Sequence, residues 1–202
     1  MLECKDVNIS FGNKKVINNY SQKFEDGKIY AILGTSGKGK TTLLRALCGL
    51  QDIDSGSITL DNKPVNKIKS GIYMMHQHYS NFPFLTCLNN VLFGIKLKRK
   101  PQKEDIKKAE QILRSVGLLY CKDNYPSELS GGMNQRLALA RILMTEPKII
   151  LMDEPMSALD EDTRKTMQDL VLEMQKDLKN TIIMVTHDER EAKKMADVII
   201  KL

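Results

Sequence analysis

The glycine-rich segment Gly34–Thr41 constrains the fold of this chain more than any other feature of its sequence. It matches the pattern G-x-x-x-x-G-K-[ST], follows the apolar run Lys28–Leu33 and precedes a stretch with helical spacing, Thr41–Leu50. In a strand, loop and helix of this kind, backbone N–H groups and the positive end of the helix dipole face a phosphate. The segment therefore predicts a phosphate-binding loop inside an α/β fold.

The loop residues predict a nucleotide site with a metal ion. Lys40 supplies a cation for the β and γ phosphates, and the hydroxyl of Thr41 suits Mg²⁺. The alternative interpretation is a glycine-rich turn with a solvated lysine. The predicted nucleotide-binding residues are Gly34, Thr35, Ser36, Gly37, Lys38, Gly39, Lys40, Thr41 and Thr42.

Two acidic residues follow a second apolar run. Ile149–Met152 reads as a buried strand, and Asp153 and Glu154 come directly after it, where open α/β sheets bind ligands. Asp153 is expected to hold Mg²⁺ through water, and Glu154 to orient or deprotonate a hydrolytic water. By themselves two such acids are more often a helix cap or a surface turn. Their pairing with the phosphate loop favours the catalytic interpretation.

Short strands alternate with amphipathic helices along the rest of the chain, which indicates a mostly parallel sheet. An antiparallel pair is expected over Leu2–Phe24, around Gly12-Asn13. Further strands are expected at Gly56–Leu60, Ile72–Met75, Lys148–Met152, Thr181–Val185 and Val198–Leu202, and helices at Lys103–Val116, Gly131–Met144, Asp162–Lys176 and Glu189–Met195. We predict one domain over 1–202, with a core from 1–77 and 146–202 and a helical subdomain over 78–145.

Composition excludes several classes of protein. With 42% hydrophobic and 28% charged residues, the chain is of the ordinary globular type. No apolar run approaches the roughly 20 residues of a membrane span, and Met1–Ser10 lacks the apolar stretch of a secretory signal, so we expect a cytosolic protein. Four scattered cysteines indicate neither a zinc site nor disulfides. The net charge of +6 is spread along the chain without interleaved aromatics, which favours a solvated surface over nucleic-acid binding.

Further motifs give the chain a specific resemblance. Leu129–Met133 (LSGGM) resembles the signature motif of the ATP-binding cassette (ABC) ATPases, and Gln77 lies where the family has its Q-loop glutamine. Ser157–Asp160 resembles the D-loop, His187 the switch histidine, and Phe11 the aromatic residue that stacks on adenine. Taken singly, Gln77, His187 and Phe11 are ordinary loop, surface and core residues. All the motifs stand in family order across nearly the whole chain.

The resemblance implies a P-loop NTPase of the ABC type and a mechanism. Two copies, or a pair of cassettes, pack head to tail, so that each ATP is held by the phosphate loop of one chain and by Ser130, Gly131, Gly132 and Met133 of the other. The implied catalytic residues are Glu154, His187 and Gln77, the implied Mg²⁺ ligands are Thr41, Gln77 and Asp153, and Asp160 belongs to the D-loop.

The same resemblance implies partners and a place in the cell. The chain would be the ATP-hydrolysing subunit of a transporter, at the inner face of the cell membrane, with integral membrane permease subunits and an extracytoplasmic solute-binding protein. Phe82–Leu85 lies in the region where the family docks a membrane subunit; it either forms an exposed apolar patch or fills the joint between subdomains. DNA-associated relatives divide the same site with very long coiled coils, whereas only about fifty residues separate Gln77 from Leu129 here, which disfavours that class. A mechanical ATPase that acts on a membrane partner without transport is the remaining alternative.

Two residues depart from the family pattern. Met133 replaces the usual glutamine, and Lys38 stands where a small residue is usual, so it either contacts a phosphate or faces solvent. The sequence LSGGM followed by Gln135-Arg136 resembles importers of the nitrate, sulfonate and taurine class and glycine-betaine systems. This favours an importer of that subgroup.

Overall fold

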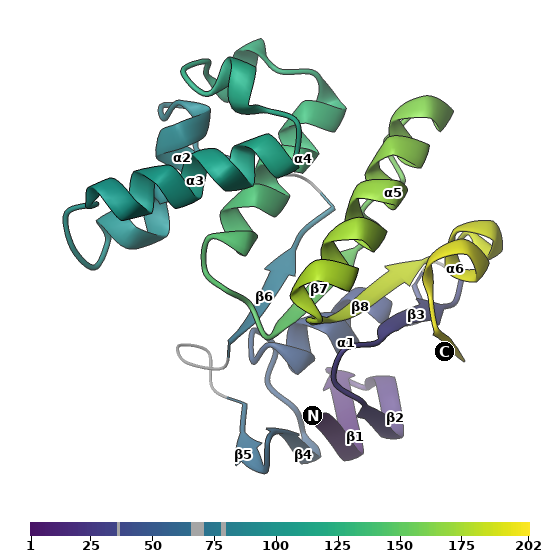
Figure 1. Cartoon of the computed structure of the whole chain (residues 1–202). Helices are drawn as coiled ribbons and strands as arrows, with labels where there is room; N and C mark the ends of the chain where they lie inside the picture. Colours follow the sequence, from purple (N-terminus) through teal and green to yellow (C-terminus); the bar gives the residue numbers. More distant parts are fainter. Residues whose placement is uncertain (36, 66–70, 78–79) are drawn as a thin grey trace. The chain divides into compact units, whose positions relative to one another are not determined.

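The structure is a computed structural model that describes residues 1–35, 37–65, 71–77 and 80–202 (Figure 1). The chain divides into two compact units. The first unit comprises Met1–Met74, Lys148–Glu154 and Met174–Leu202, and the second comprises Met75–Pro147 and Pro155–Glu173. Ser36, one of the predicted nucleotide-binding residues, lies outside the described residues. Each unit is described by itself below.

An antiparallel sheet opens the first unit. Strands β1 (Leu2–Phe11) and β2 (Lys14–Phe24) form a hairpin, and β4 (Ser55–Leu60) and β5 (Lys63–Pro64) complete the order β2-β1-β4-β5. Gly12 adopts φ 57° in the turn between β1 and β2, a conformation that glycine takes at little cost. The predicted antiparallel pair is therefore confirmed.

The second sheet carries the residues of greatest interest. Its order is β6-β7-β8-β3-β9, from strands β6 (Ile72–Met75), β7 (Ile149–Asp153), β8 (Thr181–Thr186), β3 (Ile29–Leu33) and β9 (Val198–Lys201). Strand β8 is parallel to both β7 and β3, and Asp153 pairs with Val185 while Leu33 pairs with Thr186. The residues that directly follow these three strands therefore share one edge of the sheet.

The first helix packs between the two sheets. Helix α1 (Lys40–Leu47) buries Leu43, Leu44 and Leu47 in one core with side chains of β1, β2 and β4. Alternate residues of β3, β7 and β8 face the same core, among them Tyr30, Ile32, Ile149, Leu151, Ile183 and Val185. The helix is thus held on both sides by apolar contacts, which fixes the loop that precedes it. Helix α6 (Glu189–Met195) packs against β3 and β8.

Helices dominate the second unit. They are α2 (Cys87–Lys96), α3 (Lys103–Ser115), α4 (Gly131–Leu143) and the first part of α5 (Glu161–Leu178), with short 3₁₀ turns at Leu119–Cys121 and Pro126–Glu128. Helix α2 contacts both α3 and α4. Three of these helices begin within a residue of their predicted starts, whereas α2 was not among the helices predicted. Its run LNNVLFGIK lacks a clean polar face, because Asn90 is buried and makes contacts that sequence periodicity does not reveal.

Within the residues that the structure describes, no helix combines the length and the apolar character needed to cross a membrane. All four cysteines are free and buried, as expected of packing residues.

Candidate active site

Predicted site residues from three parts of the chain meet at one edge of the parallel sheet in the first unit. The loop beginning at Gly34 follows β3, Asp153 is the last residue of β7 with Glu154 directly after it, and His187 follows β8. The backbone N–H of Glu154 donates to the carbonyl of Val185 at 3.1 Å, which holds the two strand ends together. The edge therefore combines a phosphate loop, two acids and a histidine.

Lys40 is fixed in the middle of this edge. Its side chain is only 5% exposed, and Nζ donates to the carbonyl oxygens of Gly34 and Thr35 at 2.7 and 3.1 Å. An ammonium group has three donors, and these carbonyls take two of them. The ammonium also lies 4.0 Å from Glu154 Oε1. It is thus aimed at the mouth of the loop as a pre-positioned cation.

Thr41 and Asp153 offer oxygen atoms side by side. The hydroxyl of Thr41 donates to Asp153 Oδ1 at 2.9 Å, across 112 positions of sequence. Asp153 is buried, whereas Thr41 is exposed, so the pair faces out from the sheet edge. Mg²⁺ prefers few protein oxygens together with phosphate oxygens and water, and this donor set fits that preference. A bound Mg²⁺ would neutralise phosphate charge here.

Glu154 has an unusual backbone. Its φ of 46° lies in the left-handed region, which a glutamate rarely adopts without a constraint from the surrounding structure. Its carboxylate lies between two cations or potential cations: Lys40 on one side, and His187 Nδ1, 3.5 Å from Oε2, on the other. A carboxylate held in this way can accept a proton from water and can be oriented by the histidine.

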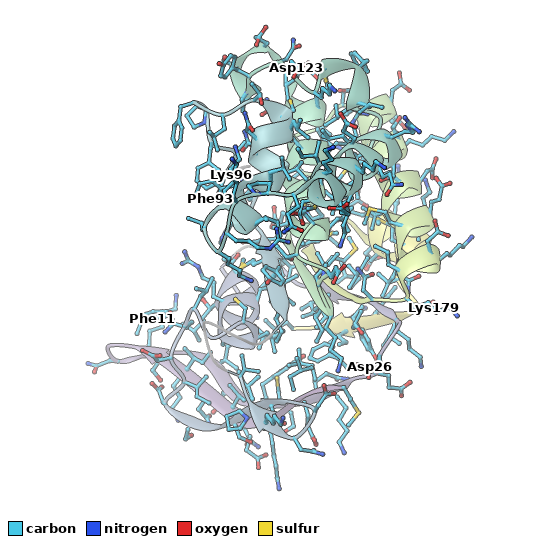
Figure 2. The ribbon with its side chains drawn as sticks, turned by 60° about the vertical axis from the view of Figure 1, so that its left-hand side comes forward. Phe11, Asp26, Phe93, Lys96, Asp123 and Lys179 are labelled. Atoms are coloured by element: carbon cyan, nitrogen blue, oxygen red, sulfur yellow. The ribbon has the colours of Figure 1, made fainter. Side chains whose placement is uncertain are left out.

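Glycine at position 39 is required by the neighbouring hairpin. Gly39 has φ 87°, and a Cβ there would lie 2.6 Å from Val16 Cγ1 on β2. The β1–β2 hairpin therefore packs directly on the phosphate loop. The same hairpin presents Phe11, whose side chain is 52% exposed near the turn (Figure 2). An exposed ring on the hairpin that contacts Gly39 suits stacking on a base. Lys38 is exposed on the same loop.

The remaining predicted residues lie in the second unit. The Ser130 side chain caps α4 by accepting from Met133 N at 3.3 Å, and Ser130 and Gly131 are exposed. The Thr163 backbone N–H donates to Asp160 Oδ1 at 2.9 Å, which holds the pKa of Asp160 below its ordinary value. Gln77 donates to Ser157 Oγ at 3.5 Å. The structure thus groups these residues on helix starts and loops of one unit.

Gly132 reveals a contact that sequence reasoning missed. A Cβ at Gly132 would lie 2.3 Å from Thr163 Cγ2, so the first turns of α4 and α5 pack without room for a side chain. Gly132→Ala is expected to destabilise the chain by about 1–3 kcal/mol, as overpacking typically does. Urea unfolding followed by circular dichroism measures the change.

A rescue variant and a control variant accompany Gly132→Ala. Thr163→Ser removes the methyl group that blocks the space, so the double variant is expected to recover most of the lost stability. Gly94→Ala serves as control, because the nearest atom to its new Cβ is Thr145 Cγ2 at 3.9 Å in the same unit. This helical substitution is expected to be neutral or stabilising by up to about 1 kcal/mol. Equal losses in both glycine variants would contradict the packing argument.

Comparison with known proteins agrees with this geometry. Residues 17–157 match a family model described as "ABC transporter". The chain belongs to the ABC transporter family. The match covers the phosphate loop, the LSGGM segment and both acids of the sheet edge, whereas Phe11 and His187 lie outside the matched residues.

Relatives in the ABC transporter family include import proteins. The chain is 40% identical to the spermidine/putrescine import ATP-binding protein PotA of Haemophilus influenzae, over 100% of this chain and 55% of PotA. It is 41% identical to the sulfate/thiosulfate import ATP-binding protein CysA of Pectobacterium atrosepticum, over 98% of this chain and 62% of CysA. The chain thus spans a little over half the length of these relatives.

Solved structures of ABC cassettes share the fold. CbiO1 of Clostridium perfringens, part of the ABC transporter complex cbiONQ, superposes with a TM-score of 0.88 at 29% identity, over 98% of this chain and 83% of that one. The ATP-binding cassette MJ0796, in a dimeric post-hydrolysis state with ADP and Pi, gives 0.84 at 28% identity, over 100% and 94%. The predicted ABC ATPase fold, with its antiparallel sheet, parallel core sheet and helical part, is therefore confirmed.

Proposed function

We propose that this chain binds and hydrolyses ATP as the ATP-binding subunit of an ABC transporter, powering solute transport through separate membrane subunits. The observation that carries the proposal is the convergence of Lys40, Glu154 and His187, with Thr41 bonded to Asp153, at one edge of the parallel sheet. Such an edge can hold the phosphates, hold Mg²⁺ and activate water. The import relatives support the transport role.

The chain's own residues divide the chemistry among them. Lys40 and the loop amides bind the β and γ phosphates, while Thr41 and Asp153 would hold Mg²⁺, which would neutralise phosphate charge. Glu154 accepts a proton from the attacking water, and His187 orients Glu154 through their 3.5 Å contact. Phe11 stacks on adenine, because its exposed ring lies on the hairpin that packs against Gly39. Thr35, Gly37, Lys38 and Thr42 complete the nucleotide site.

We propose that the site is completed by a second copy. Ser130, Gly131 and Met133 stand at the start of α4, where the helix dipole and backbone N–H groups favour an anion, and Ser130 and Gly131 are exposed. The dimeric cassette MJ0796 supports such a pairing. Two chains in head-to-tail order would therefore hold two ATP molecules, with Asp160 of each chain in the D-loop of the interface.

A membrane partner has a candidate contact surface in the second unit. Phe84 is 70% exposed. Phe82 is half-buried and packs against Phe93 of α2, with 4.0 Å between the two ring centroids (Figure 2). An exposed aromatic ring next to a rigid support is typical of an interface. We propose that permease subunits dock here, at the inner face of the membrane, with an extracytoplasmic solute-binding protein delivering the solute.

The substrate class is proposed only broadly. The LSGGM segment favours the nitrate, sulfonate and taurine class, whereas the relatives PotA and CysA carry names of polyamine and sulfate importers. All of these classes import a small solute, and we propose that this chain powers import of a small solute. We also propose the domain division into a core of 1–77 with 146–202 and a helical subdomain of 78–145.

The experiment that tests the proposal is steady-state ATP hydrolysis with Mg²⁺ at increasing chain concentration. If two chains share each site, the rate rises more steeply than linearly while dimers are sparse. Ser130→Arg is expected to bind ATP within about twofold of the parent, because the phosphate loop is untouched, yet to lose nearly all activity. Ser130→Ala is the matched control, since it removes the same cap, worth about 1 kcal/mol, without bulk or charge.

Mixing two inactive variants sharpens this test. In a mixed dimer of Ser130→Arg and Lys40→Ala chains, one composite site carries both lesions and the other carries neither. Partial activity in the mixture, with each variant silent alone, is expected when one intact site suffices. A strictly linear wild-type rate together with full activity of Ser130→Arg would instead indicate a monomeric NTPase.

A further inference from the structure

We infer that Asn81 and Asn134 are a positioning pair that fixes the signature turn at Ser130 to the segment 80–86, so that a displacement of the segment reaches Ser130. This inference rests on the proposed function for its role in hydrolysis, but its structural half does not. Both residues lie in the second unit, Asn81 in the loop before α2 and Asn134 in the first turn of α4.

Asn134 holds the turn that precedes α4. Its side chain is only 6% exposed, and Nδ2 donates to the carbonyls of Pro126, Leu129 and Ser130 at 3.0, 3.2 and 3.3 Å. These three acceptors identify Nδ2 as the donor end of the amide, so that Oδ1 points the other way. One buried amide group thus binds three backbone carbonyls between Pro126 and Ser130.

Asn81 contacts the opposite end of the same amide. Its Nδ2 donates to Asn134 Oδ1 at 3.0 Å and to the Asn134 backbone carbonyl at 2.8 Å. A buried amide oxygen that lost this donor would incur a desolvation cost, because the side chain is shielded from water. The pair is therefore a direct connection between the loop before α2 and the start of α4.

Side chains of α2 and α4 hold the segment 80–86. Asn90 is 1% exposed, accepts from the Phe82 backbone N–H at 2.8 Å and donates to the carbonyls of Phe82, Leu85 and Thr86. Arg141 of α4 donates to the Ser80 carbonyl and lies over the Phe82 ring at 4.4 Å. Burial lowers the pKa of Arg141. The segment is therefore connected to both α2 and α4.

These contacts form one continuous path from an exposed surface to the signature turn. Phe84, the exposed ring of the proposed docking surface, lies within the segment that Asn90 holds, and Asn81 connects the segment to Asn134. The experiments below measure the energetic coupling between the two ends of this path. The expected coupling has a direction: a change at Asn81 alters the turn 126–130, which Asn81 reaches through the side chain of Asn134.

Hydrogen exchange read by mass spectrometry on the full chain tests the structural half. Asn81→Ala is expected to speed amide exchange in the peptide spanning 126–136 by about tenfold, the factor that corresponds to ~1.4 kcal/mol and to one buried hydrogen bond. Asn89→Ala is the matched control. The Asn89 side chain accepts a hydrogen bond from Lys96 Nζ at 2.8 Å within α2, so this substitution removes an asparagine amide that lies outside the path to Asn134 (Figure 2). Unchanged exchange over 126–136 in Asn81→Ala would overturn the inference.

A double-mutant cycle separates coupling from general loosening. Asn134→Ala removes the shared amide, so adding Asn81→Ala is expected to give little further exchange in 126–136. The combined effect then falls well short of the product of the single effects. If the two single effects simply multiply, the residues act independently and the pair has no positioning role.

Kinetics tests the functional half. In Asn81→Ala the KM for ATP is expected to stay within about twofold, because Lys40 and its loop belong to the first unit. Turnover is expected to fall about tenfold, with the loss shared by Asn134→Ala and absent in Asn89→Ala. Coupled exchange with unchanged turnover would overturn the role in hydrolysis. Absence of ATP hydrolysis in the wild type would count against the proposed function instead, and the exchange result would still stand.

Discussion

Replacement of Glu154 by Gln is expected to lower ATP hydrolysis at least about 100-fold while ATP stays bound, because general bases commonly contribute factors of about 10² to 10⁴. Glutamine keeps the size of the side chain and the 46° φ of the backbone but cannot accept the proton of the attacking water. The loss of a negative charge 4.0 Å from Lys40 Nζ also favours the bound phosphates. Single-turnover hydrolysis and ATP titration measure the two effects separately.

The same variant is expected to accumulate as a dimer with Mg-ATP, since closure precedes hydrolysis in the proposed cycle. Size-exclusion chromatography with light scattering gives the mass directly. Glu104→Gln, an exposed acid in the first turn of α3, is the control and is expected to behave as wild type. Hydrolysis at the wild-type rate by Glu154→Gln would remove Glu154 from the role of base.

Loss of the Lys40 ammonium is expected to weaken ATP binding about 100-fold, which corresponds to ~2.7 kcal/mol and lies in the range for buried charged contacts. Lys40→Ala removes the cation that faces the phosphates. It also removes the Lys40 donor from the carbonyls of Gly34 and Thr35, of which the Thr35 carbonyl still accepts from the Lys38 backbone N–H at 3.4 Å, so the empty loop is expected to be less stable. Isothermal calorimetry with Mg-ATP measures the affinity, and a thermal melt without nucleotide measures the stability.

Lys5→Ala is the charge-matched control for this substitution, because Lys5 is an exposed lysine on β1. It is expected to leave both ATP affinity and melting temperature unchanged. Lys38→Ala gives a second comparison: its side chain is exposed, so its loss of affinity is expected to be smaller than that of Lys40→Ala. ATP affinity retained in Lys40→Ala would contradict the assignment of the phosphate loop.

Much of the candidate site was predictable because its signals are local. A loop with glycines at 37 and 39 and lysine at 40 can be recognised from eight consecutive residues, and both glycines do adopt positive φ. Asp153 and Glu154 could be predicted in the same way, because they directly follow an apolar run. The edge they share followed from a general rule, since the carboxyl ends of parallel strands meet on one side of a sheet.

Other features depend on contacts between residues far apart in the chain. The order β6-β7-β8-β3-β9 places Leu33 beside Thr186, and no local pattern encodes that pairing. The helix α2 was missed for the same reason: Asn90 is buried because it bonds to carbonyls of the preceding segment, and a periodicity argument counts it as polar and exposed.

The sequence by itself determined the phosphate loop, the acids at the end of β7, the positions of most strands and helices, and the family. Each of these features depends on a short run of residues, and the spacing of the residues within that run follows from local backbone geometry. Only the tertiary structure decided why position 132 must be glycine, because the constraint comes from Thr163 on another helix. The tertiary structure also showed that Asn81 bonds to Asn134. A hydrogen bond across 53 positions depends on how the helices pack, which the spacing of residues along the chain does not reveal.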